Sequence, residues 1–222
     1  MSQKNFSIGE AVRFGWDTMK ANFWFFVVLL IVAGFIEYIP IVIDMLLGKN
    51  MPGLAFLFRV IGWVVSIIVA IGMIRIALKI LDGEKAELKD LFSFRPFFWK
   101  YLLGAILTGL IVIGGLILLI FPAFVWALKF QYFGYLIIDR KLDAIEALKN
   151  SGKITNGVKW NLLGFSFVLL GINIVGVLAL FIGLFATVPL TMMATAFVYR
   201  KLLSQTEAIP PTEVAQATPT PA

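Results

Sequence analysis

Long apolar runs separated by short charged segments dominate the hydrophobic pattern of this chain. A helix needs roughly 20 mostly apolar residues to cross the hydrocarbon core of a bilayer. Runs that come close to this length cover residues 23–43, 59–81, 101–121, 122–138, 160–177 and 178–199. The pattern therefore predicts an all-α fold, a polytopic membrane protein with six transmembrane helices arranged as three hairpins.

Two apolar stretches exceed the length of one span and are divided. Residues 101–138 contain one charged residue, Lys129, and Pro122 is expected to mark the turn because proline suits the first turn of a helix. Residues 160–199 contain no charged residue. The second division is expected near residues 173–176, which leaves Pro189 inside the sixth helix as a predicted kink.

Two similar amphipathic segments precede the first and fifth predicted spans. Residues 144–160 read AIEALKNSGKITNGVKW and residues 8–24 read IGEAVRFGWDTMKANFW, so an offset of 136 positions aligns Glu10 with Glu146 and Trp24 with Trp160. We expect interfacial helices over about residues 7–21 and 142–157, lying in the plane of the membrane surface with their basic faces toward head groups.

Helical spacing separates small and apolar positions from charged positions in both segments. In the later segment Ala144, Leu148, Ser151, Thr155 and Val158 share one face, opposite Glu146, Lys149, Lys153 and Asn156. In the earlier segment Ile8, Ala11, Val12, Gly15 and Met19 share one face, opposite Glu10, Arg13, Asp17 and Lys20.

Positive charge gathers on one side of the predicted helices. Fourteen lysine and arginine residues lie in the N-terminal segment, the second and fourth connections and the C-terminal flank, whereas the opposite side holds Lys49 and Arg59. The positive-inside rule therefore places both termini in the cytoplasm, in a multi-pass protein of the cytoplasmic (inner) membrane. Residues 1–203 form the predicted membrane domain. Residues 204–222, with four of the nine prolines, are predicted to be a disordered cytoplasmic tail.

The amino-acid composition excludes several kinds of reaction and binding site. Of the 222 residues 60% are hydrophobic and 14% are charged, and neither cysteine nor histidine occurs. Their absence excludes disulfides, thiolate nucleophiles and metal sites built on His or Cys. We expect no catalytic residues, cofactor or metal, because Asp44, Asp82 and Asp139 fall at predicted helix ends rather than at mid-membrane depth. The net charge of +6 matches anionic lipids better than nucleic acid, since no basic soluble module is visible.

Charged residues within predicted spans are the main candidates for a site. Glu37 and Lys129 lie at similar depths below the outer surface, so we predict that they pair or share a polar cavity. The functional interpretation is a substrate or ion site. The structural interpretation, which we favour, is a neutral pair that fixes helix packing. Arg59 is the alternative partner for Glu37.

Four further basic residues are candidate contacts for lipid head groups. Arg75 and Lys79 are four residues apart and so share a helix face near the cytoplasmic end of the second span. Lys149 and Lys153 lie on the charged face of the later amphipathic segment. The alternative for Arg75 and Lys79 is that their side chains extend to the interface only to reach water.

The segment EALKNSGKITNGVKW, followed by an apolar pair ending TVPLTMMATAFVYRKL, resembles a family of uncharacterised six-helix integral membrane proteins. These are the YciC-like proteins, related to the membrane domain found beside some glycerophosphodiester phosphodiesterases. The resemblance covers about residues 6–203 and implies a fold and topology without a reaction. The family pattern often places tryptophan after the serine, whereas here Gly152 follows Ser151 and Gly15-Trp16 keeps the tryptophan in the earlier segment.

The function predicted from the sequence is that of a non-enzymatic integral membrane protein. Its role is structural or interacting, with anionic lipids contacted through a basic cytoplasmic face. The alternative is a transporter or permease component with a polar site around Glu37 and Lys129. Membrane lipids are the expected partners, further copies of the chain remain an open alternative, and nucleic acid is not expected.

Overall fold

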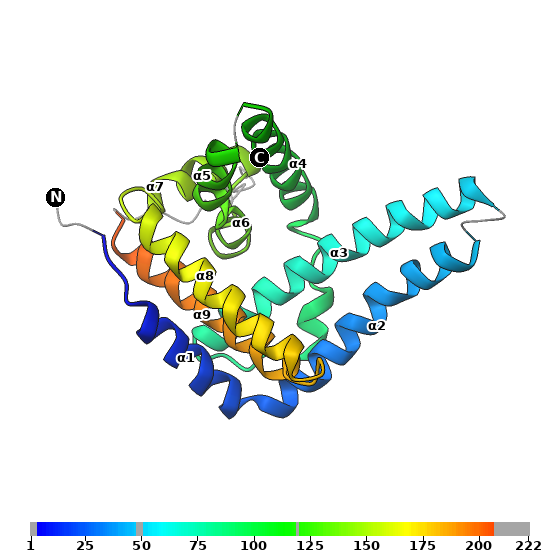
Figure 1. Ribbon diagram of the computed structural model, residues 1–222, viewed down its shortest axis with the longest axis horizontal. Coiled ribbons are helices and arrows are strands. Elements are labelled where there is room, and N and C mark those ends of the chain that lie inside the picture. Colours follow the sequence, from blue (N-terminus) through cyan, green and yellow to red (C-terminus); the bar gives the residue numbers. More distant parts are fainter. Residues whose placement is uncertain (1–3, 48–50, 119, 207–222) are drawn as a thin grey trace, which may run out of the picture.

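The computed structural model describes residues 4–47, 51–118 and 120–206, and all regular secondary structure in these ranges is helical (Figure 1). The elements in chain order are α1 (Ile8–Ala21), α2 (Phe23–Leu47), α3 (Pro52–Leu81), the short 3-10 helix η1 (Leu88–Phe92), α4 (Phe98–Leu118), α5 (Ile120–Phe130), α6 (Phe133–Arg140), α7 (Ala144–Ile154), α8 (Lys159–Leu178) and α9 (Leu184–Ser204). The all-α expectation is confirmed for the described part of the chain. Lys49 and most of the predicted tail, residues 207–222, lie outside it.

Four of the described helices, α2, α3, α4 and α8, are long and apolar enough to cross a membrane. Figure 1 shows α2 and α3 side by side, projecting away from the other helices, and α4 packs on α5 as α8 packs on α9. Large apolar side chains are exposed along the four apolar helices, among them Phe35, Phe56, Leu110 and Phe167. The apolar tails of lipids can cover such surfaces, so the architecture is that of a membrane-embedded protein.

The single helix expected over residues 122–138 is replaced by α5 and α6, which are interrupted at Gln131 and Tyr132. The interruption is stabilised from outside the segment. The Ser151 hydroxyl donates to the Lys129 carbonyl (2.9 Å), and the Tyr132 N–H donates to the Ser151 oxygen (3.2 Å). Backbone groups that a continuous helix would pair internally thus find partners on α7.

The last helix also differs from its expected bounds. The turn between α8 and α9 covers residues 179–183 rather than 173–176, and Pro189 lies inside α9 as expected. Ten residues of α9 are buried, including Met193, Ala194 and Tyr199. Because protein surrounds much of this helix, its sequence does not need the uniform apolar surface of a helix that faces lipid.

Burial agrees with the predicted faces of α7 throughout and with those of α1 in part, because Ile8 and Val12 on its predicted apolar face are half-buried. All five residues assigned to the apolar face of α7 and its C-terminal extension are buried, and all four assigned to the charged face are exposed. In α1 the charged residues are likewise exposed, while Ala11, Gly15 and Met19 are buried. The periodicity of the sequence therefore identified which side of each helix is covered.

The partner that covers these faces is protein. α1 runs antiparallel along α9, with Gly15 against Leu190 and Ala194, and with Glu10 3.7 Å from Lys201. α7 packs on α4, α5 and α6. This differs from helices lying in the plane of the membrane surface with their apolar faces in lipid. The missing side chain at Gly15 lets the backbones of α1 and α9 approach closely, which explains why α1 binds α9.

Candidate functional site

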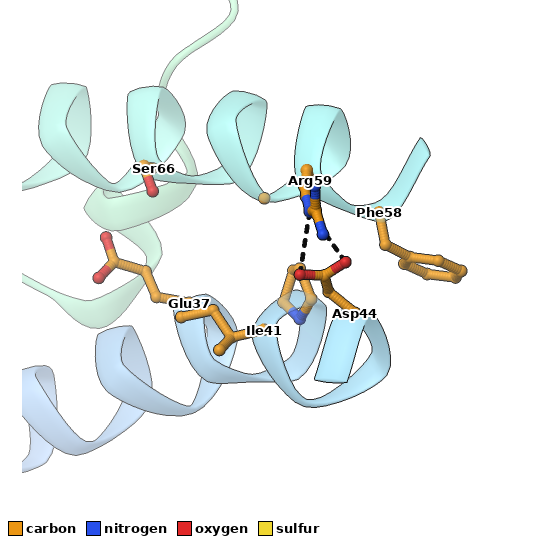
Figure 2. Close-up of a pocket in the computed structure, with 8 residues that line it drawn as sticks. Glu37, Ile41, Asp44, Phe58, Arg59 and Ser66 are labelled. Carbon is orange, nitrogen blue, oxygen red and sulfur yellow. Dashed lines mark hydrogen bonds and ion pairs between the residues drawn. The ribbon is translucent and has the colours of Figure 1, made fainter. Parts of the chain in front are cut away.

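A polar cleft opens between α2 and α3 in the projecting hairpin (Figure 2). It has a volume of about 260 Å³ and is lined by Glu37, Pro40, Ile41, Asp44, Phe58, Arg59, Gly62 and Ser66. In Figure 2 the Glu37 carboxylate and the Ser66 hydroxyl point into the space between the two helices. Such a volume holds several water molecules. The cleft thus brings polar groups together within two of the most apolar helices.

Arg59 pairs with Asp44 rather than with Glu37. The Arg59 Nε donates to both carboxylate oxygens of Asp44, at 3.0 and 3.1 Å, and the Arg59 side chain is 65% exposed. Within the described residues no ion pair joins Glu37 to a basic side chain. The alternative partner predicted for Glu37 is therefore wrong, because the Arg59 guanidinium pairs with Asp44, which is nearer the end where α2 leads into α3.

Lys129 lies elsewhere, against α7. A methyl group added at Gly152 would come within 2.9 Å of the Lys129 Cε, and the Lys129 ammonium lies 5.1 Å from the centre of the Phe130 ring. The structure thus does not bring Lys129 together with Glu37, which lines the cleft between α2 and α3. The depth comparison gave the position of Lys129 along its own helix but not the helices beside it, and α5 packs on α4, α7 and α8 whereas α2 packs on α3.

Arg75 and Lys79 do share a helix face, and that face is occupied by an acidic residue. Lys79 donates to Asp90 at 2.8 Å, and Arg75 lies 3.9 Å from the same carboxylate, whose side chain is 4% exposed. Burial by itself raises the pKa of Asp90, but hydrogen bonds from Lys79 and the Glu87 N–H, with the charges of Lys79 and Arg75, hold it below its ordinary value. Asp90 therefore stays ionised and fixes η1 to α3.

Lys149 and Lys153 are exposed on α7, as predicted. Neither forms an ion pair within the described residues, in contrast to Arg75 and Lys79. A third lysine reaches the same helix from the N-terminal segment, because the Lys4 ammonium donates to the Lys153 carbonyl at 2.6 Å. The exposed lysines of α7 remain available to an anion, whereas the pair on α3 shares one carboxylate, Asp90, which lies closer to Lys79 than to Arg75.

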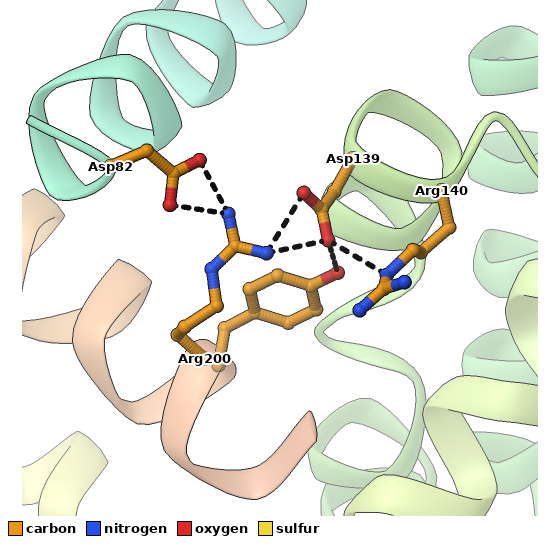
Figure 3. A network of polar contacts seen from close by, with 5 residues as sticks. Asp82, Asp139, Arg140 and Arg200 are labelled. Carbon is orange, nitrogen blue, oxygen red and sulfur yellow. Dashed lines mark hydrogen bonds and ion pairs between the residues drawn. The ribbon is translucent and has the colours of Figure 1, made fainter. Parts of the chain in front are cut away.

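An ion network joins three helices where α3, α6 and α9 end (Figure 3). The Arg200 guanidinium donates to Asp82 at 2.6 and 2.8 Å and to both oxygens of Asp139 at 3.0 Å. The Tyr199 hydroxyl donates to Asp139 at 2.8 Å, and Arg140 Nε lies 3.2 Å from the same carboxylate. Arg200 thus connects α3 to α6 from its position on α9.

Sequence reasoning missed the acidic partners Asp44, Asp90 and Asp139, because nothing in their local sequence indicates which distant cation they meet. For Ser151 and Thr155 the sequence did indicate a buried polar role. Both fell on the predicted covered face of an amphipathic segment, and buried hydroxyls need hydrogen-bond partners. The partner of Ser151 is the Lys129 carbonyl at 2.9 Å, and the closest partner of Thr155 is the Ser151 carbonyl at 2.8 Å.

Comparison of the chain with protein-family models, with curated proteins and with solved structures found no match. The chemistry of the candidate sites must therefore come from their own residues. Within the described residues no group of three or more His, Cys, Asp or Glu side chains is placed to hold a metal ion. The cleft offers two carboxylates and a guanidinium for binding, and the surface around α7 offers ammonium groups.

Proposed function

We propose that this chain is a non-enzymatic integral membrane protein, with a structural or interacting role, that contacts anionic lipids of the cytoplasmic leaflet through basic side chains. The observation that carries the proposal is a surplus of cations. Among the described residues, the following basic side chains form no ion pair: Lys4, Lys85, Arg95, Lys129, Lys141, Lys149, Lys153 and Lys159. Lipid phosphates are suitable counter-ions, each contact contributing about 1 kcal/mol.

In this proposal the chain crosses the cytoplasmic membrane six times and both termini are cytoplasmic. The three hairpins are α2 with α3, α4 with α5 and α6, and α8 with α9. The distribution of positive charge supports this orientation, because the cations without an ion pair among the described residues lie, apart from Lys129, in segments assigned to the cytoplasmic side. Burial of α9 among other helices supports a crossing for this less apolar helix.

The proposal predicts that anionic lipid stabilises the protein. Purified protein in nanodiscs should unfold at a temperature at least about 2–4 °C higher in phosphatidylglycerol than in phosphatidylcholine, because even 1 kcal/mol shifts a protein of this size by that amount. The measurement is thermal unfolding followed by tryptophan fluorescence. Salt should reduce the difference, since it screens exposed charges. Equal unfolding temperatures in the two lipids at low salt would contradict lipid contact through the basic side chains.

The cleft between α2 and α3 favours a second candidate, a transporter or permease component. The site for this candidate differs from the one predicted around Glu37 and Lys129, because the polar residues that line the cleft with Glu37 are Asp44, Arg59 and Ser66. Ionisable groups inside a membrane are costly and commonly line substrate or ion paths. Transport through this hairpin requires that the cleft be hydrated from outside.

Solvent access separates the two candidates, and the absence of native cysteine makes labelling specific. We expect Glu37→Cys and Ser66→Cys to resist a membrane-impermeant maleimide applied from outside, because the leading proposal places the cleft among lipid or helices. Lys149→Cys is the control and should react only from the cytoplasmic side. Rapid labelling of both cleft positions from outside would favour the transporter, and outside labelling at Lys149→Cys would overturn the proposed orientation.

A further inference from the structure

Hydrogen bonds from α7 fix the position of Lys129. The Ser151 hydroxyl donates to the Lys129 carbonyl at 2.9 Å. The Thr155 hydroxyl lies 3.2 Å from the same oxygen but makes its shorter hydrogen bond, 2.8 Å, to the Ser151 carbonyl, and both side chains are fully buried. The Tyr132 N–H donates to the Ser151 oxygen just beyond the end of α5. The end of α5 is therefore anchored to α7, and the side chain of Lys129 starts from a defined point beside that helix.

Gly152 provides the surface on which this side chain lies. The Cγ, Cδ and Cε atoms of Lys129 would all come within 4 Å of a methyl group at Gly152, the Cε at 2.9 Å. The aliphatic part of Lys129 therefore crosses α7 at the one position in this turn that has no side chain. Any larger residue at this position would displace the ammonium group.

Other cations border the same position. On a helix, residues three or four apart are neighbours, so Lys149 lies beside both Gly152 and Lys153. Both are exposed, and the Lys4 ammonium lies 2.6 Å from the Lys153 carbonyl. The nearest acidic residue along this helix surface, Glu146, forms no ion pair within the described residues. Like charges at neighbouring positions on a helix repel one another, and a bound anion removes that repulsion.

An apolar surface adjoins the cations. Ile145 lies two helical turns before Gly152 on the same side of α7, and its side chain is 56% exposed. Trp160, at the start of the next helix, is 73% exposed. A ligand that fits has a compact anionic group joined to an apolar part, and a phosphate oxyanion can accept hydrogen bonds from several ammonium groups at once.

We propose that Lys129, Lys149 and Lys153, with Gly152 as the floor, form a binding site for the phosphate group of an anionic phospholipid. The inference rests on the proposed function and makes it more specific, because it names one location instead of a general basic surface. Lys129 distinguishes a specific site from a general basic surface. Its side chain is positioned by α5 and α7 together, whereas a general basic surface needs no such anchoring.

Gly152→Ala tests the site without changing the net charge. The added methyl group displaces the Lys129 side chain, which is flexible at its far end, so the fold should persist while the ammonium moves. We expect native mass spectrometry of the detergent-solubilised protein to show about fivefold weaker retention of phosphatidylglycerol, the effect of losing one lysine contact. Gly171→Ala is the matched control, because a methyl group there meets no atom within 4 Å. Circular dichroism of both variants checks the fold.

A second comparison uses two triple variants that each lose three positive charges. The triple variant Lys129→Gln, Lys149→Gln and Lys153→Gln should lose affinity on the order of 100-fold, whereas Lys85→Gln, Arg95→Gln and Lys141→Gln together should lose far less. Equal losses in the two triple variants, or wild-type affinity in Gly152→Ala, would overturn the site and leave the proposed function intact. If wild-type protein does not prefer phosphatidylglycerol to phosphatidylcholine, the proposed function fails as well. Displacement of the lipid by millimolar inorganic phosphate would reassign the site to a soluble phosphate compound.

Discussion

Gly72→Ala is expected to lower the free energy of unfolding by about 3 kcal/mol, the upper part of the range for overpacking a tight contact. Gly72 lies on α3 where η1 crosses it. A methyl group there would meet the backbone of Leu91, with the Leu91 Cα at 2.6 Å and its carbonyl carbon at 2.7 Å. A backbone cannot swing aside as the end of a side chain can, so η1 has to move away from α3.

Displacement of η1 would break two further interactions. Leu91 is fully buried, and the neighbouring Asp90 accepts a 2.8 Å hydrogen bond from Lys79. Thermal unfolding in detergent should show a midpoint lowered by about 6–12 °C. Gly109→Ala is the control, because a methyl group there meets nothing within 4 Å and alanine favours the helix. Gly72→Ala that unfolds at the wild-type temperature would show that η1 does not pack on α3 as described.

Arg200→Gln is expected to destabilise the protein by about 2–3 kcal/mol, less than the 3–5 kcal/mol typical of a fully buried pair because the Arg200 side chain is 31% exposed. The substitution removes the guanidinium that joins Asp82 on α3 to Asp139 on α6. Asp139, whose side chain is 13% exposed, then loses its bidentate partner and keeps only Arg140 and the Tyr199 hydroxyl. A largely buried carboxylate that keeps one of its two cationic partners is compensated only in part, which is costly.

The neighbouring residue supplies the control for this network. Lys201 is more exposed and approaches Glu10 only at 3.7 Å, so Lys201→Gln should cost less than about 1 kcal/mol. Asp139→Asn combined with Arg200→Gln should cost less than the sum of the single changes, by at least about 0.5 kcal/mol, because each single change already breaks the pair. Strict additivity in denaturant unfolding would show that Arg200 and Asp139 do not interact in solution.

The covered and exposed faces of α1 and α7 illustrate what periodicity predicts well. Small and apolar residues at three- and four-residue spacing are buried, and Lys149 and Lys153 opposite them are exposed. Local spacing is sufficient here because every residue of a helix takes its direction from the same backbone geometry. The pattern did not reveal that α9 covers α1, since lipid and protein both accept an apolar face.

Lys129 illustrates the limit of counting positions along one segment. Its depth was counted along its own helix, but the helix it meets is set by tertiary packing, because the Ser151 hydroxyl, more than twenty residues later, anchors the Lys129 carbonyl to α7. Arg59 shows the same limit, because Asp44 competes with Glu37 for its guanidinium. Partner choice depends on distances between helices, and these are not encoded in the spacing within one helix.

By itself the sequence determined the all-helical class, the apolar helices suited to a membrane and the charged faces of α1 and α7. These features depend on composition and on periodicity within single helices. The tertiary structure alone decided that α5 ends at Phe130, that Arg75 and Lys79 share the carboxylate of Asp90, and that the side chain of Lys129 lies against Gly152. Each of these depends on groups from separate helices meeting at hydrogen-bonding or van der Waals distance, which only the packing of the whole chain sets.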